Sequence, residues 1–381
     1  MDGADVRVCL VCFEGDRGGG AVLNGEHVDQ IYSDLSAGQA NLTDARRLSS
    51  NLGVCFQGPV KVGPFEVEGE VAREWLSAPI NPNGRPNSDV LRPWANASDI
   101  VRRPSGKWII DFGMLQEVGA SAYEKPFEYV RKNVMPSRLA NRDEQRRMNW
   151  WRLGRSGSDL KAATGKLARQ ILSPRVSKHR IFTWAPPQLL PDSRLVSIAR
   201  DDDTCFGVLH SRFHEIWSVR LGGWHGVGND PQYTPSLGFE TFPFPNGLTP
   251  AVDPADYAED PRAVAIASAA QRLHELRENW LNPSDLVRRE PEVVPGYPDR
   301  ILPMSDEAAQ KLKKRTLTNL YNERPTWLRH AHVALDDAVS AAYGCPRPPQ
   351  GDAWQVRHPQ RGRSDPLGDH YGSDEWSAGA G

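Results

Sequence analysis

Arg180-Ile-Phe-Thr-Trp184 and Leu195-Val-Ser-Ile-Ala199 decide the fold class of this chain. Both are short apolar runs bounded by proline-bearing turns, which is typical of strands, and Lys107-Trp-Ile-Ile-Asp-Phe112 predicts another. Apolar residues at helical spacing predict helices between and after these strands, at Val118 to Asn133, Asn141 to Leu153, Leu160 to Leu172 and Phe206 to Arg220. Short strands interleaved with helices predict an α+β fold and not a doubly wound parallel sheet.

The flanks of this mixed region differ in character. On the N-terminal side, Val6–Phe13 predicts a buried strand, and Ala21–Val28 predicts a hairpin around Asn24-Gly25. Past Asn246 the pattern becomes helical, with predicted helices at Pro261 to Trp280, Asp306 to Tyr321 and Trp327 to Tyr343. After Cys345 the chain is rich in Pro, Gly, Arg and Asp without periodicity, so residues 345–381 are expected to be a disordered tail.

Positive charge is concentrated in one segment of the chain. Residues 131–180 carry fourteen Lys/Arg against three Asp/Glu, while the whole protein of 381 residues has a formal net charge of −2. The segment therefore contributes +11 and the remainder −13. Neutralising phosphates with Lys and Arg releases condensed counterions, so such segregation favours a polyanionic partner. The charge distribution therefore predicts a protein that handles nucleic acid.

Composition excludes other classes of protein. No run approaches eighteen apolar residues and the N-terminus does not read as a signal peptide, so no membrane association is expected. The five cysteines are scattered and odd in number, and Cys9 and Cys12 form a C-x-x-C without a second pair. Reduced core thiols are favoured over a zinc or redox site. These observations predict a cytoplasmic protein.

Several segments, taken in order, resemble one family. They are Asn81-Pro-Asn-Gly-Arg-Pro-Asn-Ser-Asp-Val90, Trp108-Ile-Ile-Asp-Phe-Gly113, Tyr123-Glu-x-Pro-Phe127, Val176-Ser-Lys-His-Arg180, Phe206-Gly-Val-Leu-His-Ser-Arg212 with His214 and Trp217, Phe239-Glu-Thr-Phe-Pro-Phe-Pro245, Arg315-Thr-Leu-Thr-Asn-Leu-Tyr-Asn322, and Leu335-Asp-x-Ala-Val339 running to Ala342-Tyr-Gly344. Together they resemble the C-terminal half of MmeI-like adenine-specific DNA methyltransferases, which belong to type IIG (IIL) restriction-modification systems. The resemblance covers roughly residues 1–344.

The resemblance implies a domain organisation. Residues 1–60 correspond to the last strands of a Rossmann-like methyltransferase domain, and residues 61–246 to a mixed α/β target recognition domain. Residues 247–344 correspond to a small helical C-terminal domain. In the complete enzyme the methyltransferase domain holds S-adenosylmethionine, and an N-terminal endonuclease precedes it. An upstream methyltransferase or endonuclease portion, or a separate chain, is therefore an expected partner.

The chain departs from the family where the chemistry resides. The catalytic tetrapeptide Asn-Pro-Pro-aromatic and the Gly-rich loop that binds S-adenosylmethionine are both absent. Asn81-Pro82-Asn83-Gly84 has the wrong third and fourth residues, and no aromatic is available to stack on a flipped base. We therefore expect no catalytic residue, no bound cofactor and no metal in this chain alone, and both ends look truncated relative to the family.

Candidate DNA-binding residues fall into two functional groups. Cations near the predicted helices of the basic segment suit phosphate contacts, which position a protein without reading sequence; they are Arg131, Arg138, Arg142, Arg146 and Arg147. Trp150-Trp151 lies among them and reads as a core anchor more than as a base-stacking platform. Loop side chains of the types that pair with base edges suit readout; they are Arg220, His225, Asn229, Asp230 and Gln232, and the aromatic Tyr233 of the same loop is a further candidate contact.

Three further sets have alternatives that the residues leave open. Lys178-His179-Arg180 carries DNA-facing donors or is a plain basic loop. His210, Ser211, Arg212 and His214 face a groove or belong to an ordinary structural helix; the His210/His214 spacing also suits a metal, but no H-E-x-x-H frame follows. Asn83, Arg85 and Asn87, with Ser88, form a contact loop or a turn that satisfies its own backbone.

Two functions from different classes follow. The first is the DNA-recognition half of a site-specific adenine methyltransferase, inactive by itself. The second is a non-catalytic DNA-binding specificity subunit that works with a separate methyltransferase chain. An RNA-processing or nuclease module is weaker, because the sequence lacks an aromatic RNA-binding signature and an acidic metal cluster beside a lysine.

Overall fold

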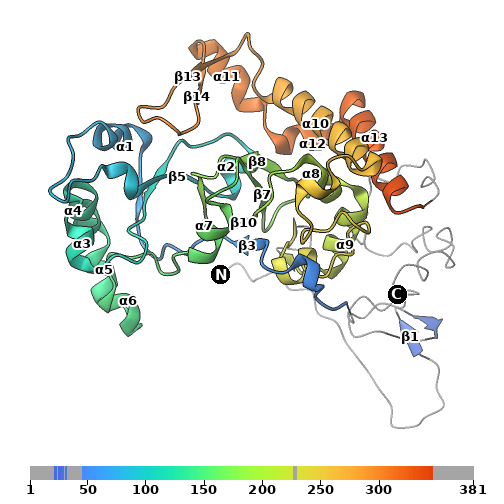
Figure 1. Cartoon of the computed structure of the whole chain (residues 1–381), viewed down its shortest axis with the longest axis horizontal. Coiled ribbons are helices and arrows are strands. Elements are labelled where there is room, and N and C mark those ends of the chain that lie inside the picture. Colours follow the sequence, from blue (N-terminus) through green and yellow to red (C-terminus); the bar gives the residue numbers. More distant parts are fainter. Residues whose placement is uncertain (1–20, 24, 30, 32–44, 226–229, 346–381) are drawn as a thin grey trace.

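The computed structural model describes residues 21–23, 25–29, 31, 45–225 and 230–345. The predicted strand Val6–Phe13, the Cys9/Cys12 pair and the tail after Cys345 lie outside these residues. Within them, no helix is both long enough and apolar enough to span a membrane. The molecule is elongated, with a smaller lobe at one end and a larger body at the other (Figure 1).

An antiparallel sheet forms the centre of the body. Its strands run in the order β3 (Cys55–Gln57), β10 (Leu195–Ile198), β7 (Gln170–Pro174) and β8 (Thr183–Ala185). In β10, Val196 and Ile198 are fully buried, as are Ile171 and Leu172 in β7. Strands that are apolar on both faces need cover on both sides, and helices supply it.

Helices pack against this sheet and form one core with it. α8 (Asp203–His210) contacts α10 (Pro261–Leu281), and α13 (Thr326–Ala342) packs on both. Gly207 lies where these helices meet, since a Cβ there would come 2.6 Å from Ile266 Cγ2. α9 (Arg212–Leu221) and α12 (Leu317–Glu323) complete the cover.

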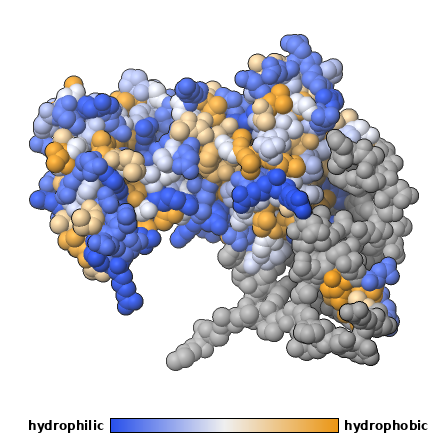
Figure 2. All heavy atoms as spheres, turned by 60° about the horizontal axis from the view of Figure 1, so that its bottom comes forward, coloured by the Kyte–Doolittle hydropathy of each residue, from blue (hydrophilic) through white to orange (hydrophobic). Residues whose placement is uncertain are grey.

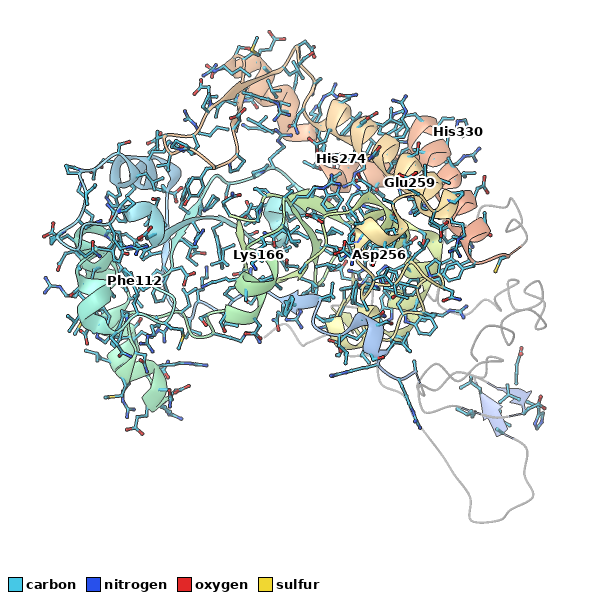
Figure 3. The ribbon with its side chains drawn as sticks, viewed as in Figure 1. Phe112, Lys166, Asp256, Glu259, His274 and His330 are labelled. Atoms are coloured by element: carbon cyan, nitrogen blue, oxygen red, sulfur yellow. The ribbon has the colours of Figure 1, made fainter. Side chains whose placement is uncertain are left out.

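The smaller lobe has its own sheet and core. The strand order is β4 (Glu66–Val67), β6 (Trp108–Ile110), β5 (Leu91–Ala95) and β9 (Leu190–Pro191), with β5 and β9 parallel. Around it lie the helices α1 (Gly69–Leu76), α3 (Glu117–Ser121), α4 (Glu124–Asn133), α5 (Met135–Leu139) and α6 (Glu144–Met148). Phe112 is buried at the centre of this lobe (Figure 3). Trp150 and Trp151 are buried there too, which confirms them as core anchors.

Short elements link and extend these units. α2 (Ala97–Val101) packs on β7 between lobe and body, and α7 (Ser158–Thr164) lies against β3. The hairpin β11 (Trp224–His225) and β12 (Asp230–Pro231) follows α9, and β13 (Val287–Glu290) pairs with β14 (Arg300–Pro303) before α11 (Asp306–Lys314). β1 (Ala21–Leu23) and β2 (Glu26–Val28) form the predicted N-terminal hairpin, with Gly25 at φ +90°.

The α+β prediction is confirmed as mixed helices and small sheets, but several predicted elements were wrong in detail. The predicted helix Leu160 to Leu172 ends at Thr164, and its last residues form β7 in the middle of the sheet. The predicted helix Phe206 to Arg220 is two helices, because Ser211 leaves helical geometry and caps α9 through its side chain. α6 is the only helix within the predicted Asn141 to Leu153.

Packing groups the chain differently from the expected domains. β3 pairs with β10, so Cys55–Gln57 belong to the central sheet, and a Rossmann-like remnant is not confirmed. Helices on both sides of residue 246 share one core. As functional boundaries, residues 60 and 246 stay predictions.

Candidate nucleic-acid interface

The most exposed part of the basic segment is a helical projection of the smaller lobe. α5 and α6 extend away from the lobe (Figure 1), and Figure 2 shows a hydrophilic projection at that end of the molecule. We call residues 135–148 the arm. Arg142 is exposed, while Arg146 and Arg147 are half-buried at its surface. Arg146 pairs with Asp143 at 3.1 Å, and Arg147 Nη1 donates to the carbonyls of Asn141 and Arg142.

The arm is anchored by a buried arginine. Arg138 is 2% exposed, and its Nη2 donates to Lys61 O (2.9 Å) and Arg152 O (2.8 Å). Burial lowers the pKa of this guanidinium. Arg138 therefore joins the arm to the lobe and cannot reach a duplex from where it lies, so we remove it from the predicted phosphate contacts. Arg131, just before the arm, is exposed and pairs with Glu128 at 2.7 Å.

Two arginines in the second half of the basic segment make contacts that stabilise the fold. Arg180 is 6% exposed; Nη1 donates to Pro174 O (3.0 Å) and Nη2 to Pro231 O (3.2 Å). Its guanidinium lies 4.8 Å from the ring centre of Tyr233, and burial lowers its pKa to about 10. Arg169 stacks 3.6 Å from the ring centre of Trp184 and pairs with Asp203. The predicted contacts of residues 131–180 with a polyanion are thus limited to the exposed cations of this segment, which include Lys166 after α7 (Figure 3).

The predicted helix-borne contacts at 210–214 form part of the core. His210 is 6% exposed, and Ser211 and His214 are fully buried. His214 Nδ1 lies 3.0 Å from Leu209 O and its Nε2 lies 3.2 Å from Gly238 O. Burial lowers the pKa of His214 to about 3, so the ring is neutral. These side chains fix the junction of α8 and α9, and the groove-facing role predicted for them is corrected.

Some predicted residues of this region do remain at the surface. Arg220, in the last turn of α9, is exposed, and Arg212 is half-buried, with its backbone N–H donating to Asp336. Among the described residues no group of three or more His, Cys, Asp or Glu is arranged to hold a metal ion.

The described C-terminal end of the predicted readout loop is hydrogen-bonded to the residue that follows β7. Tyr233 N–H donates to Arg175 O (2.6 Å), and Gln232 N–H donates to Gly223 O (2.7 Å). Tyr233 itself is fully buried, so its predicted DNA contact is corrected to an anchoring role. Asp230 and Gln232 are half-buried at the surface. Asn229 lies outside the described residues, and for His225 only the backbone, in β11, is described.

The Asn81–Val90 loop takes the alternative of a self-satisfied turn. Asn83 Oδ1 accepts the Arg85 N–H (3.1 Å), and Gly84 has φ +74°. Asn87 is 3% exposed and donates to Trp75 O (2.9 Å), so its predicted DNA contact is also corrected. Arg85 is exposed and pairs with Asp89.

A second basic surface joins the β7–β8 loop to the helical region. Lys178 Nζ donates to Asn322 Oδ1 (2.7 Å), and His179 Nε2 lies 2.9 Å from the same oxygen. The pKa of His179 is lowered by burial and by the nearby charges of Arg324 and Lys178. The sequence reasoning missed Asn322 and Arg324. The sequence did offer a signal for Arg324. Proline often follows the end of a helix, and the residue that ends the helix is commonly glycine, whereas here Arg324 precedes Pro325.

Comparisons with known proteins give one informative likeness. The fold resembles the structure of the type IIL restriction-modification enzyme MmeI in complex with DNA, with a TM-score of 0.57 and 17% identity. The match covers 85% of this chain and 37% of that one, so this chain spans little more than a third of the neighbour's length. No family model and no curated protein matches the chain. At 17% identity, this structural similarity supports a fold like that of the family that the sequence resembles, and no more than the fold.

Proposed function

We propose that this chain recognises double-stranded DNA as part of a restriction-modification enzyme. One observation carries the proposal: 85% of the chain shares its fold with a restriction-modification enzyme whose structure was solved with DNA bound. The exposed cations of the arm and the exposed Lys178 support it, since phosphate contacts supply a large share of the affinity of such proteins for duplex DNA.

The arm and residues 220–232 are proposed to have different roles in DNA binding, because they belong to different structural elements. The arm presents its arginines on helices and is suited to phosphate contacts that fix position. Within residues 220–232, Arg220 lies at the end of α9, and Asp230 and Gln232 lie just before Tyr233 in the chain. The N–H of Tyr233 donates to Arg175 O, and side chains held by a folded scaffold suit base readout. Sequence specificity is therefore proposed to reside in the second part.

The finer proposal concerns the complete enzyme. It would transfer a methyl group from S-adenosylmethionine to adenine, with the cofactor and the catalytic tetrapeptide supplied by a methyltransferase portion or by a separate chain. In a bacterial cell such an assembly would work at the nucleoid. This chain alone should leave radiolabelled methyl incorporation into plasmid DNA at background; turnover above background would contradict the assignment of catalysis to another portion.

Duplex binding itself is tested by fluorescence anisotropy with labelled random-sequence duplexes over a series of salt concentrations. We expect binding whose affinity falls linearly, on logarithmic axes, with salt. Selection from the random pool should enrich one motif. If the chain binds heparin and duplex equally well and enriches no motif, the cationic surface is non-specific and the proposal of sequence recognition fails.

A further inference from the structure

Arg324, which ends α12, has a backbone conformation that is unfavourable for residues other than glycine. Arg324 has φ +47° and ψ +61°, the left-handed region. Helices commonly end with one residue in this conformation, and glycine is the usual choice because it has no Cβ to clash. Among the described residues only Val62 is another non-glycine with positive φ. Backbone strain of this kind often persists where the side chain has a function.

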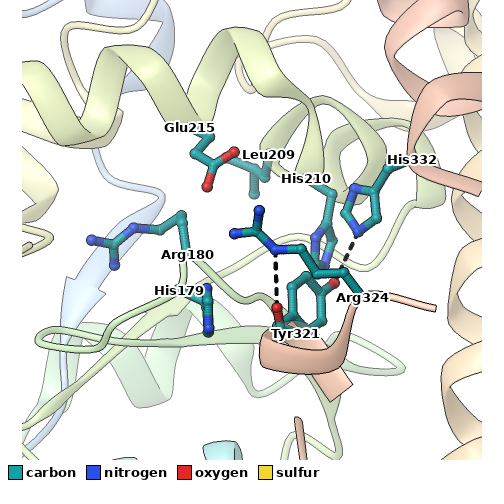
Figure 4. Close-up of a pocket in the computed structure, with 8 residues that line it drawn as sticks. All are labelled: His179, Arg180, Leu209, His210, Glu215, Tyr321, Arg324 and His332. Carbon is teal, nitrogen blue, oxygen red and sulfur yellow. Dashed lines mark hydrogen bonds between the residues drawn. The ribbon is translucent and has the colours of Figure 1, made fainter. Parts of the chain in front are cut away.

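The side chain of Arg324 lies over a narrow pocket between the β7–β8 loop, α9 and the helical region. Figure 4 shows it among His179, Arg180, Glu215 and His210. Its Nε donates to Tyr321 O at 3.0 Å, which orients the guanidinium. Arg324 as a residue is exposed, so the mouth of the pocket can be reached from solvent.

The inner wall of the pocket is also cationic. Arg180 lines it, is 6% exposed, and its Nε has no hydrogen-bond partner. Its two other nitrogens are held by the carbonyls of Pro174 and Pro231, so the guanidinium is fixed in place. Beside the mouth of the pocket, Lys178 and His179 both contact Asn322 Oδ1. The ammonium group of Lys178 is thereby held close to the pocket.

Glu215 is the carboxylate among the lining residues, and burial raises its pKa, while Arg180, Arg324 and Arg212 oppose that shift. The cations outnumber this acid. The cavity is only about as large as one water molecule, so it can accept a single ligand atom but not a complete phosphate group.

We propose that this pocket, the phosphate seat, receives one non-bridging oxygen of a phosphate group, held by Arg324 at the mouth and Arg180 inside. The inference rests on the proposed function, which makes a DNA backbone phosphate the ligand; a free phosphate ion shares the chemistry. The seat adjoins β12, because Arg180 donates a hydrogen bond to the carbonyl of Pro231. A phosphate fixed there would set the register of the duplex against Asp230 and Gln232.

The structural alternative is that Arg324 only caps α12 and neutralises Glu215. Arg324→Gly separates the two roles, since glycine is at ease at positive φ and lacks the guanidinium. With a phosphate seat, the melting temperature should stay unchanged or rise, duplex affinity should fall roughly three- to tenfold, and the salt slope should drop by about one. A lower melting temperature with unchanged affinity would establish the capping role and overturn the proposal.

Two further variants sharpen the test. Arg324→Lys keeps a cation and should recover part of the affinity, but not all, because the planar fork is lost. Arg329→Ala is the matched control, since Arg329 is an exposed arginine on α13 that does not line the pocket. It should leave the affinity and the salt slope unchanged; an equal loss in Arg329→Ala would show a diffuse charge effect and not a seat.

Two further measurements distinguish a free phosphate ion from a phosphate of the DNA backbone as the ligand. Inorganic phosphate titrated with the wild type should give a broadened ³¹P resonance that sharpens with Arg324→Gly. Duplexes with single methylphosphonates should lose affinity at one position in the wild type and not in the variant. If the wild type binds no duplex, the proposed function fails, whereas the ³¹P measurement still decides whether the seat exists. No ³¹P difference, together with no methylphosphonate-sensitive position, would overturn it.

Discussion

The outer part of the arm, residues 142–148, and residues 166–185, which include β7 and β8, both carry several cations, yet the two regions use their arginines in opposite ways. On the arm, Arg142 faces solvent, and its neighbours Arg146 and Arg147 remain at the surface. In residues 166–185, Arg180 is buried between carbonyls and an aromatic ring, and Arg169 is stacked on Trp184. The first set can contact a polyanion, whereas the second stabilises the fold.

The difference follows from the chemistry of the guanidinium. Its five donors can satisfy several backbone carbonyls, and its planar face packs on aromatic rings. Where strands and turns leave carbonyls pointing inward, as at Pro174 and Pro231, an arginine is the side chain that fits. A high density of arginine in a sequence therefore does not by itself measure surface charge.

Arg180→Met is expected to give the largest change in stability of the proposed variants. A small change would contradict the structural role assigned to the buried arginine. The change removes both hydrogen bonds to carbonyls and the contact with Tyr233, so the free energy of unfolding should fall by about 3 kcal/mol. Urea unfolding measures it. Lys166→Met, at an exposed lysine of the same segment, is the control. A loss below about 0.5 kcal/mol would mean that the buried arginine is not structural.

The arm should show the reverse behaviour. Replacing Arg142, Arg146 and Arg147 together with alanine should lower duplex affinity roughly 10- to 100-fold and reduce the salt slope by up to about three, because up to three phosphate contacts are lost. Stability should change by less than about 1 kcal/mol, since surface ion pairs contribute little. Anisotropy and urea unfolding measure the two effects.

The matched control for the arm is the exposed lysine cluster of α11, Lys311, Lys313 and Lys314. The same number of charges is removed there, on the helical region. Alanine at these positions should leave the salt slope within about one unit of the wild type. A loss equal to that of the arm variant would show that net charge matters and location does not.

A smaller, pH-dependent effect should distinguish the body from the lobe. Burial lowers the pKa of His214 and of His332 to about 3, so below the ordinary histidine pKa of about 6.5 the unfolded chain binds protons that the native body does not. Stability is thus lost as the pH falls from about 6.5 towards 3. Asp336 opposes this, because burial raises its pKa to about 7 and the native state gains its proton as the pH falls.

The net loss should be on the order of 1 kcal/mol between pH 6.5 and 5.5. Because residues 61–155 contain no histidine, hydrogen exchange should report weakened protection in α8, α9 and α13 before α4. Equal weakening of both regions on this pH step would show that the lobe and the body unfold as one unit.

The sequence predicted the regular elements with clear periodicity and failed where packing overrode it. Pro261 to Trp280 and Trp327 to Tyr343 became α10 and α13 almost as predicted. Leu160 to Leu172 was predicted as one helix, but its apolar end pairs with β10 as β7, because an apolar run suits a buried strand as well as a buried helix turn. Several residues predicted to contact DNA are buried, because the type of a residue does not by itself determine its burial.

By itself the sequence determined the α+β character, the two tryptophans as core anchors and the concentration of cations in one segment, because these depend on composition and local spacing. Tertiary structure alone decided which cations are exposed. Arg138 and Arg180 were drawn inside by carbonyls from distant segments, at Lys61 and Pro231. It also brought Arg324 to the pocket beside Arg180, at a separation along the chain that no local pattern encodes.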